Sequence, residues 1–79
     1  MINVNEVKEL IGLYKSQLYK DFYAVDIIVE RSGLLFKIRC PYNTELKAQQ
    51  TMNAITEKKQ QNIVKPDYRP YIYLVEREK

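Results

Sequence analysis

Few residues of this sequence could carry catalytic chemistry. The 79-residue chain contains no histidine, which is the commonest general acid or base and a frequent zinc ligand. Its one cysteine, Cys40, has no histidine to stabilise a thiolate, so we expect a buried, unreactive thiol. The remaining candidates are carboxylates scattered along the chain, which we expect to be solvated or ion-paired: Asp21, Asp26, Glu30 and Asp67. The sequence therefore predicts a protein that is not an enzyme.

Sequence features of cofactor binding, export and membrane insertion are also missing. The two glycines, Gly12 and Gly33, stand alone, so the sequence contains no glycine-rich phosphate loop. The first residues, MINVNEVKE, lack the basic and apolar regions of a secretory signal, and no apolar run approaches the ~18 residues that span a bilayer. We expect a cytoplasmic protein without cofactor, metal or membrane contact.

Length and composition are typical of one small folded domain, spanning residues 1–79. Hydrophobic residues make up 46% of the chain and charged residues 29%, which indicates a globular rather than a disordered protein. The net charge of +3 comes from 13 basic and 10 acidic residues mixed along the sequence, so it is weak support for a polyanionic partner.

The N-terminal segment has the spacing of an amphipathic helix. Asn3 and Glu6 match a capping box at its start, and the pattern ends near Tyr19 or Lys20. Apolar residues recur at steps of three and four: Val4, Val7, Leu10, Ile11, Tyr14 and Leu18. This stripe predicts a first helix that packs on a core.

A β-hairpin follows the first helix. Residues 22–31 and 34–40 alternate with a period of two, and Ser32-Gly33 between them suits a two-residue turn. The register fixed by that turn places only apolar pairs on one face, among them Val29 with Phe36. It also brings Asp26 opposite Arg39 on the other face.

The C-terminal half predicts a second helix and a third strand. Asn43 or Thr44 can cap a helix that runs to about Gln61. The sequence KPDYRP at 65–70 excludes helix and interior strand, and alternation resumes over 71–77.

We therefore predict an α+β fold, a two-layer sandwich of order α-β-β-α-β. Its three-stranded sheet has the order 2-1-3, with strand 3 parallel to strand 2 and both helices on one face. An alternative is a second hairpin, in which residues 63–65 pair with the last strand around Pro66 and Asp67.

The sheet face opposite the helices is the most informative candidate surface. It would present aliphatic, basic and aromatic side chains together, and the rigid proline-flanked loop would supply two more contacts. The residues of this candidate partner-binding site are Ile28, Leu35, Lys37, Arg39, Tyr71, Tyr73, Tyr68 and Arg69. Whether Tyr71 and Tyr73 or Ile72 and Leu74 face the core is left open by the alternation.

These features favour a small protein-binding module that acts stoichiometrically, as an inhibitor or adaptor of a larger protein. An origin in a phage or mobile element is compatible with this interpretation, and the protein would then lie in the host cytoplasm. A homodimer is compatible with such a surface. One alternative is a nucleic-acid-binding module that uses the aromatic and basic sheet face. Another is a structural component of a virion or other assembly.

Overall fold

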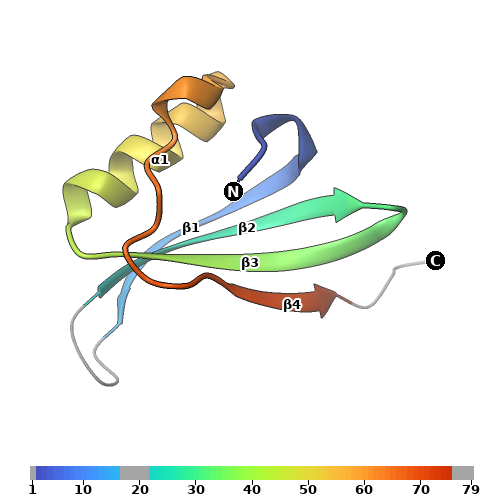
Figure 1. Cartoon of the computed structure of the whole chain (residues 1–79), viewed down its shortest axis with the longest axis horizontal. Coiled ribbons are helices and arrows are strands. Elements are labelled where there is room, and N and C mark those ends of the chain that lie inside the picture. The colour runs from blue at the N-terminus through green and yellow to red at the C-terminus, as the bar shows by residue number, and fades with distance from the viewer. Residues whose placement is uncertain (1, 17–21, 76–79) are drawn as a thin grey trace.

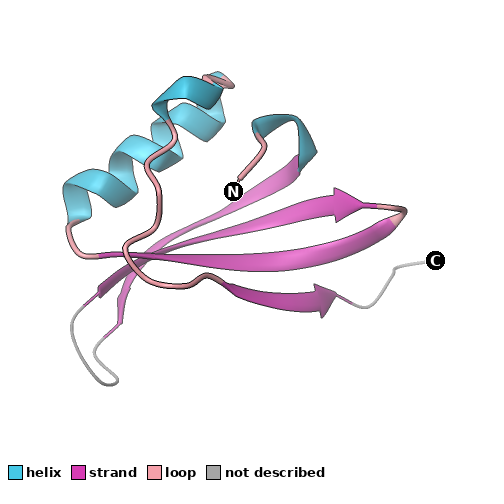
Figure 2. Ribbon diagram, in the orientation of Figure 1, coloured by secondary structure: helices cyan, strands magenta, loops and turns pink. Residues whose placement is uncertain are grey.

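The protein folds as a four-stranded antiparallel sheet with one helix on one face (Figures 1 and 2). The computed structural model describes residues 2–16 and 22–75. The strand order is β1-β2-β3-β4, and the chain order is β-β-β-α-β. The elements are β1 (Val7–Ser16), β2 (Phe22–Arg31), β3 (Leu34–Tyr42), α1 (Glu45–Glu57) and β4 (Tyr71–Val75), with short 3-10 turns η1 (Val4–Glu6) and η2 (Gln60–Asn62).

The predicted hairpin is confirmed as β2 and β3. Ser32 and Gly33 both have positive φ, 53° and 78°, as a primed two-residue turn requires. Val29 pairs with Phe36 in the expected register. Asp26 also lies opposite Arg39 and receives two hydrogen bonds from its guanidinium.

The predicted first helix is wrong, because this segment forms η1 and then β1. Asn3 does cap the turn, but its side chain accepts from the N–H of Asn5, and the helical geometry ends at Glu6. The register of β1 on β2 shifts twice, between Val7 and Glu9 and between Leu10 and Gly12. Each irregularity inserts one residue, so that inward-facing residues are three positions apart instead of two. Val7, Leu10 and Leu13, which all pack against the core, therefore imitate helical spacing. The expected end of this helix, with Leu18, lies outside the described residues.

The predicted sheet order and strand direction are also wrong. Because β1 pairs with β2, it occupies the position that we expected the last strand to take. β4 instead pairs with the other free edge, on β3, and runs antiparallel to it. The loop between α1 and β4 returns the chain to the end of β3, where the Asp67 N–H donates to the Pro41 carbonyl at 3.0 Å. The alternative hairpin is not formed, since residues 63–65 belong to no strand.

α1 covers only part of the sheet. Thr44 caps it as expected, but the helix ends at Glu57, where Lys58 turns left-handed with φ 56°. α1 packs on β1, β2 and β3, and buried side chains from these elements form the core with the N-terminal segment. We call the sheet face under α1 the inner face and the opposite face the outer face. The outer face carries no described helix or strand (Figure 1).

Candidate interaction surface

The outer face gathers six of the eight predicted site residues. Cross-strand pairing puts Lys37 beside Ile28 on one side and beside Tyr73 on the other. Arg39 pairs with Tyr71 in the same way. The six residues that share this face are Ile28, Leu35, Lys37, Arg39, Tyr71 and Tyr73. The hairpin register was sufficient to group Ile28, Leu35, Lys37 and Arg39, whereas the side of Tyr71 and Tyr73, which the sequence left open, follows from the pairing of β4 with β3.

The basic side chains of the outer face are held by a buried carboxylate. Asp26 is only 4% exposed, although it lies on the face away from α1. Arg39 donates to both of its oxygens, Nε to Oδ1 at 3.1 Å and a terminal nitrogen to Oδ2 at 3.2 Å. The Lys37 ammonium lies 3.6 Å from Oδ2. The hydrogen bond to Asp26 raises the pKa of Arg39. Lys37 and Arg39, the cations that the nucleic-acid alternative would use, are therefore already paired with the carboxylate of Asp26.

β1 contributes an aromatic residue that the sequence interpretation had assigned to the core. Tyr14 pairs with Ala24 on the outer face, and the Arg39 guanidinium carbon lies 5.0 Å from the centre of the Tyr14 ring. Partial burial and the charge of Asp26 raise the pKa of Tyr14. This residue was missed because the two register shifts of β1 cannot be read from spacing alone.

The three most exposed large apolar side chains of the sheet, Leu74, Ile72 and Tyr71, belong to β4. Tyr71 and Tyr73, on the outer face, are 53% and 48% exposed. Ile72 and Leu74 pair with Ile38 and Phe36 on the inner face, yet remain 57% and 65% exposed. The structure thus answers the open question about alternation: the aliphatic pair faces inward, but neither pair enters the core. β4 is apolar and accessible on both faces.

The backbone of β3 fixes which groups of β4 are free. In a two-residue hairpin, the pair that flanks the turn, here Arg31 with Leu34, is the hydrogen-bonded kind. Successive residues of a strand direct their N–H and C=O groups to opposite neighbours. Since the backbone of Leu34 faces β2, those of Leu35 and Lys37 face β4.

It follows that β4 presents two residues to solvent at the sheet edge. Tyr73 pairs with Lys37, so its backbone faces β3. Ile72 and Leu74 then direct their N–H and C=O groups away from the sheet, as expected of the terminal strand in the order β1-β2-β3-β4. Four backbone groups on an apolar strand are left for a partner.

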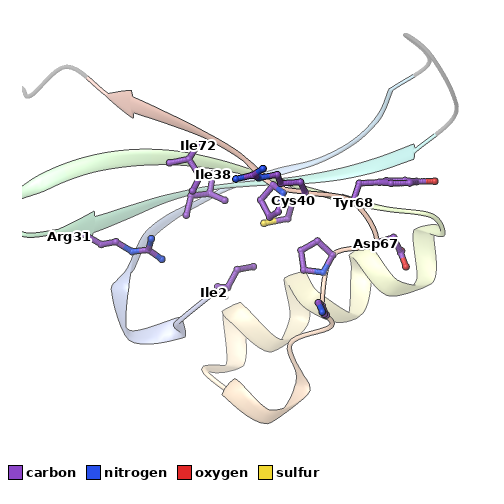
Figure 3. A pocket seen from close by; sticks show the side chains of 11 residues that line it. Ile2, Arg31, Ile38, Cys40, Asp67, Tyr68 and Ile72 are labelled. Carbon is purple, nitrogen blue, oxygen red and sulfur yellow. The ribbon is translucent and has the colours of Figure 1, made fainter.

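The two loop residues of the predicted site lie elsewhere, beside a groove on the inner face. The groove has a volume of about 590 Å³ and runs between the N-terminal segment, β3 and the loop before β4 (Figure 3). Tyr68 and Arg69 line it, together with Ile2, Ile38, Cys40 and Ile72. Tyr68 and Arg69 therefore line this groove and do not belong to the strands that carry the other six residues. Ile72 connects the groove to β4.

The groove offers little chemical reactivity. Cys40 is fully buried, and burial raises the pKa of its thiol to about 12, so the thiolate is a minor form at neutral pH. Asp67 binds the Asn43 N–H and the Lys47 ammonium, and these contacts lower its pKa. Within residues 2–16 and 22–75, no three Cys, Asp or Glu side chains gather closely enough to hold a metal ion.

Two further findings concern the chain as a whole. Among the described helices, none is long and apolar enough to span a membrane. Comparison with protein-family models, with curated proteins and with solved structures gave no match for this chain.

Proposed function

We propose that the protein is a non-enzymatic protein-binding module that pairs β4 with an extended segment of its partner. The observation that carries this proposal is the exposure of four consecutive apolar side chains, 48–65% each, on a terminal strand. An unprotected edge strand binds another strand through its backbone groups, while alternate side chains provide specificity. In the complex, the free groups of Ile72 and Leu74 would form the hydrogen bonds.

Charge supports a protein partner over a nucleic acid. Tyr71–Val75 contains no charged residue, so β4 offers phosphates only neutral donors, which are its tyrosine hydroxyls and outward N–H groups. On the outer face beside β4, the cations Lys37 and Arg39 are bound to Asp26. A nucleic acid would have to compete with that carboxylate for them.

Crosslinking in the cells that produce the protein tests the proposal. A photo-crosslinking phenylalanine analogue replaces Tyr73 in one version of the chain and Leu46 in another. Leu46 is a suitable control because it is 76% exposed, on α1. We expect a protein adduct from position 73, resistant to nuclease, and none from position 46.

A second substitution ties the adduct to the edge of β4. Ile72→Pro removes an N–H that faces away from β3, so it blocks strand pairing while leaving the β3–β4 hydrogen bonds in place. Ile72→Val keeps the N–H and is the matched control. We expect Ile72→Pro to abolish the adduct and Ile72→Val to retain it. An adduct that survives Ile72→Pro, arises equally from position 46 or is destroyed by nuclease would contradict the proposal.

A further inference from the structure

We infer that the strand that β4 binds is β4 of a second copy of the chain, giving a symmetric dimer with a continuous eight-stranded sheet. This inference rests on the proposed function and adds the identity of the partner. Its basis is that the free edge of β4 is complementary to itself in an antiparallel register that pairs Ile72 with Leu74.

The outward backbone groups of β4 fit that register. Self-pairing about a two-fold axis at Tyr73 places Ile72 opposite Leu74 of the second copy, and Leu74 opposite Ile72. Both pairs are then hydrogen-bonded, so all four outward N–H and C=O groups of each strand find partners. Moving the axis to Ile72 would set Leu74 opposite Pro70, which has no N–H to donate.

The side-chain pairs that this register creates are also favourable. Residues directly opposite each other point to the same face, so Ile72 and Leu74 of the two copies would meet on the inner face. Tyr73 would meet its own copy on the outer face. These are the side chains that the isolated chain leaves 48–65% exposed, and Tyr71–Val75 contains no charged residue, so no like charges meet within these five positions.

The surroundings leave the edge accessible. β4 is the terminal strand of the sheet, and Figure 1 shows no described helix or strand on its far side. The groove opens beside Ile72, so Leu74 of the second copy would lie at its mouth. The dimer would thus cover the apolar end of the groove as well as the strand.

Disulfide trapping tests the register directly. At the two-fold axis, position 73 faces its copy as a non-hydrogen-bonded pair with Cα atoms about 4.5 Å apart, within disulfide reach. Tyr73→Cys should form an intermolecular disulfide under mild oxidation. Tyr71→Cys is the matched control, because the two copies of position 71 would be about 13 Å apart, four residues along the strand. The native Cys40 is buried and is not expected to crosslink.

Light scattering of the unmodified chain provides the second measurement. A strand-pairing interface this small is expected to be weak, so the mass is followed from about 1 µM to 1 mM. We expect the mass to rise from 9.4 kDa toward twice that value, and Ile72→Pro to keep the chain monomeric with an unchanged circular dichroism spectrum.

Failure of the dimer can be separated from failure of the proposed function. A chain that stays monomeric throughout, or Tyr71→Cys and Tyr73→Cys disulfides that form equally, would overturn the dimer. If Ile72→Pro still abolishes a crosslink from position 73 to a different protein, β4 binds a strand but the partner is not a second copy.

Discussion

The two edge strands of this sheet differ in how they are protected. β1 has two register shifts and carries charged residues at Lys8, Glu9 and Lys15, and its inner face packs under α1. β4 is regular, carries no charge within Tyr71–Val75 and lies beyond the cover of α1. Irregular, charged edges resist strand addition, whereas regular apolar edges favour it. The β1 edge is thus protected against the addition of another strand, and the β4 edge is not.

The core on the inner face, which contains Cys40 and Tyr42, should make the stability of the protein sensitive to alkaline pH. Burial raises the pKa values of Cys40 and Tyr42 to about 12, so both groups stay neutral in the folded protein while they ionise in the unfolded chain. The stability that they contribute is complete below about pH 9 and is lost as the pH rises toward 12. Between pH 8 and 11 we expect the free energy of unfolding to fall by about 3 kcal/mol through Cys40 and about 1 kcal/mol through Tyr42.

Urea titrations at both pH values measure this loss. In Cys40→Ala the thiol contribution is removed, so the difference between pH 8 and 11 should shrink by most of the Cys40 share. A variant whose stability falls as much as that of the unmodified chain would show that Cys40 is not shielded, and that α1 does not close this part of the sheet.

Two leucines provide the most direct comparison of the edges. Leu10 on β1 and Leu74 on β4 both belong to edge strands and point to the inner face. Leu10 packs against the core, while Leu74 is 65% exposed. Leu10→Ala should lower the free energy of unfolding by about 2 kcal/mol. Leu74→Ala should change it by less than about 0.5 kcal/mol.

Chemical denaturation of dilute protein, where a weak dimer is dissociated, measures these two effects. Equal losses would show that β4 is as well packed as β1, and the distinction between the edges would fail. A loss at Leu74 that appears only at high protein concentration would instead report the interface.

The parts of the fold that could be predicted from sequence are those that depend on local chemistry. The turn at Ser32-Gly33 fixes every β2–β3 pair, and Thr44 caps α1 through its own side chain. The first strand could not be identified, because an inserted residue separated the inward-facing Val7 and Leu10 by three positions. The exposed Ile11 and Tyr14 then completed a helical stripe that does not exist in the structure. The glycine beside the second shift, Gly12, is the only local signal of that irregularity.

One error at β1 then propagated to the topology. Without a strand at 7–16, the free edge of β2 was the natural position for the last strand, and a parallel crossover followed. The candidate surface was less affected, since the alternation within β3 and β4 does not depend on which strand lies beside β2. What it missed, Tyr14 and the burial of Asp26, both require β1 in its correct place.

The prediction with the smallest expected effect tests whether the charge of Lys8 or the two register shifts prevent strand addition at β1. Lys8 lies 3.9 Å from Glu30 in an exposed ion pair, which contributes little to stability. Lys8→Ile removes the charge but leaves both register shifts, so we expect the free energy of unfolding to change by less than about 0.5 kcal/mol. Since the shifts still interrupt the ladder, no new oligomer should form when Ile72→Pro already blocks β4. Larger species of the double variant in light scattering would show that the charge of Lys8, and not the register shifts, had prevented strand addition at β1.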